Sequence, residues 1–151
     1  VAAGGIVDGR GLAAALALGA DGVWVGTRFI ATPEARSVRG YKDVLLRARE
    51  DDTVVTRAYT GKTCRVIANR YTERYERGEL QPDPFPMQVV RTMQEGVNHL
   101  GGDETTPGVD PEREFFPAGQ GVGAIHEIVP AGELVQRFVD EAEAVLTKLR
   151  P

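Results

Sequence analysis

The sequence has little of what marks three common classes of protein. It contains a single cysteine, Cys64, so no disulfide can form within the chain and no cysteine-based zinc cluster is available. Its 18 basic residues are outnumbered by 22 acidic ones, which argues against nucleic acid or a membrane surface as a partner. No apolar run approaches the roughly 20 residues that a membrane span requires. We therefore expect a cytoplasmic protein that binds no nucleic acid, membrane or metal.

Length and composition are those of an ordinary globular domain. The 151 residues are 42% hydrophobic and 26% charged, which is enough for one domain with its own core. The chain begins without methionine, and residues 1–6 read as the end of a buried strand. We therefore expect that residues are missing upstream.

The first part of the chain alternates between short apolar strands and helical segments. Strands are expected at 1–6 and 22–25, and the residues between them have helical spacing, with Asp8 at the start and Gly19 at the end. A short helical turn is expected at 28–31. A strand, a helix and a second strand form a unit whose strands pair in parallel with a right-handed crossover. This pattern predicts an α/β fold.

The remainder of the chain is expected to be mostly helical. Further elements are predicted as a helix from Pro33 to Ala48, a strand at 53–56, a polar helix at 69–77, a helix at 87–100 and a last helix from Pro130. The predicted apolar face of the 87–100 helix consists of Val89, Val90, Met93, Val97 and Leu100. Segment 101–117 is rich in glycine, proline and acidic residues and is expected to be a mobile loop.

The strongest chemical signal is glycine at the carboxyl ends of the two expected strands. Gly4 and Gly5 follow the first strand, and Gly26 follows the second. Glycine lets a ligand approach the backbone closely and leaves amides exposed, and a helical turn that follows adds further amides. Thr27 can add a hydroxyl hydrogen bond. Two such ends, one helix apart, predict a phosphate site, of the kind formed after the last two strands of a (β/α)8 barrel.

Several motifs resemble the nitronate monooxygenase family, formerly called 2-nitropropane dioxygenases. The most specific of them are AAGGIVDGRG at 2–11, GTRF at 26–29 and AGQGVG at 118–123. Weaker matches lie at 13–23, 31–34, 41–42, 52–56, 60–61, 65, 69 and 128–131. The likeness therefore covers nearly the whole chain.

The resemblance implies the C-terminal portion of a (β/α)8 TIM barrel, with its last two strands, followed by a mostly helical extension. Residues 1–36 would be the end of a barrel that binds flavin mononucleotide (FMN), and residues 37–151 a helical extension packed on it. The N-terminal part of the enzyme would be absent. An eight-stranded barrel reduced to two strands has an open edge, so we expect a stable isolated chain to self-associate as a homo-oligomer or to rearrange.

The resemblance also implies the chemistry and the binding residues. Members of the family are oxidoreductases that hold FMN non-covalently and oxidise alkyl nitronates with dioxygen. The residues expected to hold the FMN phosphate are Gly4, Gly5, Gly26 and Thr27. The family's catalytic histidine lies upstream of this chain, so no catalytic residue is expected here and the isolated chain should be inactive.

Three further polar residues, Gln120, His99 and His126, are candidates for a site. By resemblance the turn at 119–123 folds back towards the barrel mouth, which would let Gln120 contact flavin or substrate; the alternative is a purely structural turn. This turn lacks the preceding strand and the later acidic residue of a dinucleotide fingerprint. His99 and His126 do not match the family's catalytic position and are expected to be surface or capping residues.

Three other functions compete with nitronate oxidation. A related flavin enzyme could reduce an enoyl thioester, although the chain lacks a basic cluster suited to a carrier protein or coenzyme A. A barrel enzyme for a nucleotide substrate, like inosine-monophosphate dehydrogenase, needs a catalytic cysteine between barrel strands, whereas Cys64 follows both strand ends. The third alternative is a non-catalytic half-barrel.

Overall fold

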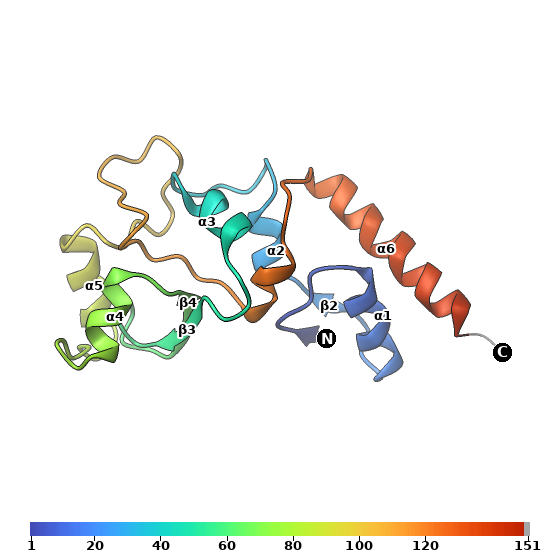
Figure 1. The fold of residues 1–151 in the computed structure, drawn as a ribbon, viewed down its shortest axis with the longest axis horizontal. Coiled ribbons are helices and arrows are strands. Elements are labelled where there is room, and N and C mark those ends of the chain that lie inside the picture. Colours follow the sequence, from blue (N-terminus) through green and yellow to red (C-terminus); the bar gives the residue numbers. More distant parts are fainter. Residues whose placement is uncertain (150–151) are drawn as a thin grey trace.

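The computed structural model describes residues 1–149, which form two lobes joined by short elements (Figure 1). The elements are β1 (Ala2–Ala3), α1 (Gly9–Ala17), β2 (Val23–Trp24), α2 (Thr27–Ile30), α3 (Tyr41–Arg47), β3 (Thr53–Thr56), β4 (Cys64–Ile67), α4 (Arg70–Glu76), α5 (Met87–Gln94), the 3-10 helix η1 (Gln120–Ala124) and α6 (Ala131–Lys148). We call β1, α1, β2 and α6 the strand lobe, and α3 to α5 with β3 and β4 the cap lobe. Within the described range no helix is long and apolar enough to cross a membrane.

The strand lobe contains the predicted strand–helix–strand unit. β1 and β2 pair in parallel, with Ala2 opposite Val23. The Asp8 side chain caps α1 by accepting a hydrogen bond from the Gly11 amide at 3.1 Å. The helix ends before Gly19, whose φ of 93° is left-handed and favours glycine. The parallel pairing and both ends of the helix agree with the sequence-based prediction.

Helix α6 packs beside α1 and closes the strand lobe (Figure 1). It begins directly after Pro130, as predicted. Its buried residues Leu134 and Phe138 form a small core with Val129. The Phe138 ring stacks on Phe29 of α2 at a centroid distance of 6.5 Å. The C-terminal helix therefore returns to the strands with which the chain begins.

The cap lobe contains an antiparallel hairpin that the sequence analysis predicted only in part. β3 pairs with β4 so that Thr53 faces Ile67 and Thr56 faces Cys64. The second strand was missed because it is four residues long and lies close to the turn at Gly61. It is stabilised by a distant segment, since the Ile67 amide donates to the carbonyl of Phe116 at 2.9 Å. The expected helical extension thus includes a β-hairpin.

Helix α3 begins later than predicted. The sequence predicted a helix from Pro33, whereas the structure begins it at Tyr41. Gly40 precedes it with a left-handed φ of 83°, and a helix cannot continue through that conformation. Residues 33–40 form turns and irregular backbone instead.

Helix α5 is shorter than predicted and buries the opposite face. It ends at Gln94, close to Gly96 with a left-handed φ of 65°, instead of continuing to residue 100. Its fully buried side chains, Gln88 and Thr92, are polar. Their burial is possible because Gln88 donates a hydrogen bond to the Ala58 carbonyl and Thr92 donates one to the Tyr59 carbonyl. The apolar residues that remain exposed on it are Met87, Val90 and Met93. The predicted apolar face was therefore wrong for Val90, Met93 and Leu100, which are exposed, whereas Val97, beyond the end of the helix, is buried as predicted.

The contact between α1 and α6 can be tested at one glycine. A Cβ on Gly9 would lie 2.5 Å from the Phe138 carbonyl oxygen and 2.6 Å from the Ala142 nitrogen. We expect Gly9→Ala to lower the free energy of unfolding by about 1–3 kcal/mol, measured by urea denaturation, because the helices must separate.

Gly132→Ala is the matched control, since Gly132 also lies in a helix but a Cβ there has no neighbour within 4 Å among the described atoms. It should leave stability unchanged or raise it by up to about 1 kcal/mol. Equal losses in the two variants would contradict the close packing of α1 on α6.

Candidate functional site

The glycines at the two strand ends line a single hollow of about 160 Å³. Its walls are the residues that follow β1, the residues that follow β2, and the start of η1. We call this hollow the glycine cup and define it by Gly4, Gly5, Gly26, Thr27, Gly119 and Gly121. The structure thus brings together the four residues that the sequence singled out for phosphate binding.

The backbone of the cup is open where the strands end. Gly4 and Gly5 have left-handed φ values of 96° and 71°, which other residues rarely adopt. A Cβ built on Gly4, Gly5 or Gly26 would meet no described atom within 4 Å. Helix α2 begins directly after Gly26, and the amides of a first helical turn lack partners within the helix. An acceptor such as a phosphate oxygen can therefore approach the main chain directly.

The third wall of the cup comes from η1, far away in the sequence. A Cβ on Gly121 would lie 2.7 Å from Cγ1 of Val7 and 3.1 Å from the Gly5 carbonyl oxygen, so only glycine permits this approach. The Gly119 amide donates to Oγ1 of Thr27 at 3.0 Å. The sequence analysis did not assign these two glycines to the cup, although their alternating spacing within 118–123 was a visible signal.

Gln120 lies between the two glycines but does not line the cup. It is the first residue of η1 and its side chain is exposed. Its predicted contact with flavin or substrate stays a prediction.

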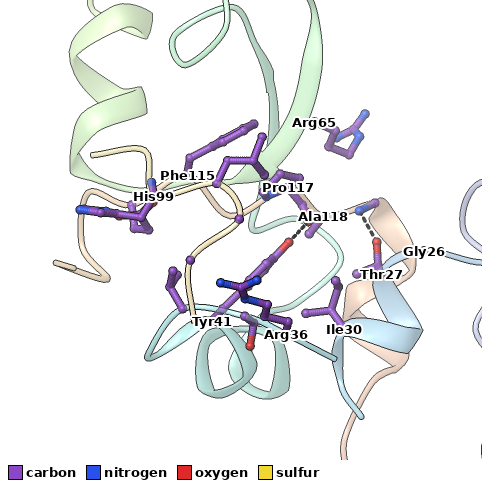
Figure 2. A pocket seen from close by; sticks show the side chains of 17 residues that line it. Gly26, Thr27, Ile30, Arg36, Tyr41, Arg65, His99, Phe115, Pro117 and Ala118 are labelled. Carbon is purple, nitrogen blue, oxygen red and sulfur yellow. Dashed lines mark hydrogen bonds and ion pairs between the residues drawn. The ribbon is translucent and has the colours of Figure 1, made fainter. Parts of the chain in front are cut away.

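A second and larger hollow adjoins the cup. It has a volume of about 450 Å³ and shares Gly26, Thr27 and Gly119 with the cup. Its apolar walls include Ile30, Val38, Tyr41, Phe115, Pro117 and Ala118, and we call it the apolar cavity. Figure 2 shows Gly26 and Thr27 at one side of it and His99 at the other. The cavity therefore extends from the cup to the cap lobe.

Tyr41 belongs to the wall of the apolar cavity and is already fully engaged. Its hydroxyl donates to the carbonyl of Pro117, as Figure 2 shows, and its ring stacks on Phe116 at a centroid distance of 4.6 Å. Burial raises the pKa of Tyr41 well above its ordinary value. The residue thus stays neutral and serves as a structural hydrogen-bond donor.

His99 occupies an environment that the sequence did not reveal. The Glu114 side chain is only 1% exposed, and its Oε2 lies 2.7 Å from Nδ1 of His99 while its Oε1 accepts from the His99 amide at 2.8 Å. Both residues line the apolar cavity. The expected surface or capping role of His99 was therefore wrong, because a buried carboxylate 15 residues away holds its ring. His126 is exposed and lines neither the cup nor this cavity.

Cys64 lies outside both hollows. It is half-buried in β4, and burial raises the pKa of its thiol. A thiol in this state is a weak nucleophile, so Cys64 is poorly suited to the catalytic role that a nucleotide-converting barrel would require. Among residues 1–149, no three His, Cys, Asp or Glu side chains gather closely enough to hold a metal ion.

Comparison with known proteins identifies the family. A sequence profile described as nitronate monooxygenase matches residues 1–141. The chain belongs to the nitronate monooxygenase family. A putative monooxygenase, Rv1533, of Mycobacterium tuberculosis is 38% identical over 146 residues, which cover 93% of this chain and 38% of that protein. A probable nitronate monooxygenase of Staphylococcus aureus is 37% identical over 109 residues, which cover 70% of this chain and 30% of that protein.

Two solved structures have the same fold over nearly the whole chain. FabK from Thermotoga maritima matches with a TM-score of 0.78 and 36% sequence identity, covering 98% of this chain and 45% of that one. Nitroalkane oxidase from Streptomyces ansochromogenes matches with a TM-score of 0.80 and 32% identity, covering 98% of this chain and 40% of that one. The α/β fold is thus that of the family, and the chain spans less than half the length of each of these relatives.

The buried pair at the end of the apolar cavity gives a stability prediction. Glu114→Ala leaves the amide and Nδ1 of His99 without their acceptor, so we expect a loss of about 1–3 kcal/mol in the free energy of unfolding. Glu112→Ala is the control, since its side chain is 66% exposed and should matter by less than about 0.5 kcal/mol. Urea denaturation measures the free energy of unfolding of both variants. A similar loss in the two would show that Glu114 does not anchor His99.

Proposed function

We propose that this chain carries the FMN-phosphate end of an oxidoreductase that oxidises alkyl nitronates with dioxygen. The observation that carries the proposal is the glycine cup, where glycines of two parallel strand ends and of the η1 segment line one small hollow. Membership of the nitronate monooxygenase family supports the same reading. The barrel portion would comprise residues 1–36, and residues 37–151 would be the extension that packs on it.

The residues of the cup fit a phosphate. Phosphate oxygens only accept hydrogen bonds, and the cup offers main-chain amides around Gly4, Gly5 and Gly26. The Thr27 oxygen accepts from Gly119, which leaves the hydroxyl hydrogen free to be donated to a ligand. Side chains at the three glycines would fill the space that the phosphate needs. When bound, FMN would supply the redox chemistry by accepting electrons from the substrate.

The apolar cavity supports a role in substrate binding. It adjoins the cup through Gly26, Thr27 and Gly119, and its mostly apolar walls exclude water from a bound alkyl chain. Tyr41 and Pro117 satisfy each other's polar groups, so the wall they form presents carbon to the ligand. The chain itself would therefore bind and orient the substrate, while the family's catalytic histidine would lie upstream.

Reduction of an enoyl thioester by the same flavin is the second candidate. The apolar cavity, about 450 Å³ in volume, has room for an acyl chain as well as for an alkyl nitronate. The two reactions separate in steady-state assays of the chain supplemented with the upstream barrel segment. Consumption of dioxygen with a nitronate supports the first proposal, and oxidation of a nicotinamide donor by an enoyl thioester supports the second.

The flavin proposal predicts saturable binding of FMN. In an absorbance titration of the purified chain, shifted flavin bands should saturate, and Gly26→Asp should weaken binding at least about tenfold because a carboxylate would occupy the cup and repel phosphate. Gly132→Asp, in the first turn of α6 and outside the cup, is the control and should bind as the wild type does.

The upstream barrel segment separates the remaining outcomes. Binding that appears only when this segment is added would identify the cup as one part of a shared site. Absence of flavin binding with and without the segment would contradict the assignment and favour a non-catalytic half-barrel.

A further inference from the structure

The glycine cup contains no charge to balance a phosphate. All side chains that line it, from Ala3 to Val7, from Trp24 to Thr27 and in η1, are uncharged. A phosphate monoester carries about −1.5 to −2 charges at neutral pH. The chain as a whole has a net charge of −4, so its long-range field also disfavours an anion. A cation near the cup would therefore strengthen phosphate binding considerably.

Two arginines line the apolar cavity that adjoins the cup, and their environments differ. Arg36 is 70% exposed and lies 3.7 Å from Asp103, which offsets its charge. Arg65 is partly buried on β4 and donates from Nη1 to Oγ1 of Thr53 at 3.1 Å. Within residues 1–149, no carboxylate lies within 4.0 Å of Arg65. Its charge thus remains available to a ligand.

The main chain connects Arg65 to the rim of the cup. The carbonyl of Arg65 accepts from the amide of Ala118 at 3.2 Å. The next residue, Gly119, donates its amide to Oγ1 of Thr27 at 3.0 Å. Figure 2 shows Arg65, Gly26 and Thr27 towards the same side of the cavity and His99 on the other. The cation therefore belongs to the cup end of the cavity.

We propose that Arg65 pairs with the phosphate of the bound flavin and supplies the positive charge that the glycine cup lacks. The proposal rests on the proposed flavin function and adds a cofactor-binding residue from the cap lobe. Arg65 lines the cavity that shares Gly26 and Thr27 with the cup, and an arginine guanidinium can donate two parallel hydrogen bonds to phosphate oxygens. The β3–β4 hairpin then has a function, which is to place this side chain beside the cup.

Parallel titrations with FMN and riboflavin test the proposal, because riboflavin lacks only the phosphate. The wild-type chain should bind FMN more tightly than riboflavin. Arg65→Gln should weaken FMN binding by about 10- to 100-fold, as expected for loss of a charge-assisted hydrogen bond, and leave riboflavin binding unchanged. Arg65→Lys, which keeps the charge, should retain part of the preference for FMN. Arg77→Gln, at an exposed arginine outside both hollows, is the matched control and should affect neither ligand.

The outcomes separate this proposal from the flavin assignment. If Arg65→Gln weakens the binding of FMN and riboflavin equally, or changes neither, Arg65 does not bind the phosphate. The proposal is then overturned while the flavin assignment stands. If Arg65→Lys binds FMN no better than Arg65→Gln, charge compensation is likewise overturned. If the wild-type chain binds neither flavin, with or without the upstream barrel segment, the flavin function falls and this proposal falls with it.

Discussion

The close approach of η1 to the end of β1 is the constraint on which the site depends. Gly121 permits it, because any side chain there would collide with Val7 and the Gly5 carbonyl. The hydrogen bond from Gly119 to Thr27 fixes η1 against α2 at the same place. Since η1 follows the cap lobe in sequence, this contact also attaches that lobe to the strands. The cup and the apolar cavity both exist because this junction is tight.

The two hollows differ in size and lining, and each suits a different kind of ligand. The cup is small and lined by main chain, which suits a compact anion that only accepts hydrogen bonds. The apolar cavity is larger and lined mostly by carbon, which suits an extended apolar ligand. Polar groups at its margins, such as the His99–Glu114 pair and Arg65, are held by specific hydrogen bonds. The junction residues Gly26, Thr27 and Gly119 belong to both hollows, so ligands in them would be neighbours.

The sequence predicted the features that depend on nearby residues. Asp8 and Gly19 mark the ends of α1 through local backbone chemistry, and the glycines after each strand identified the cup before its geometry was known. Features that depend on distant partners were missed. Gln88 is buried because it donates to the Ala58 carbonyl 30 residues away, and His99 is fixed by Glu114. Neither partner could be recognised from spacing along the chain.

The most direct test of the account is a glycine-selective isotope-labelled sample followed by amide NMR during titration with FMN. The account predicts saturable shifts confined to the cup glycines, foremost Gly4, Gly5 and Gly26, while Gly78 and Gly132 stay unchanged because they lie outside both hollows. Shifts spread over glycines outside the cup, or unchanged cup amides at saturating flavin, would contradict a phosphate site at the two strand ends.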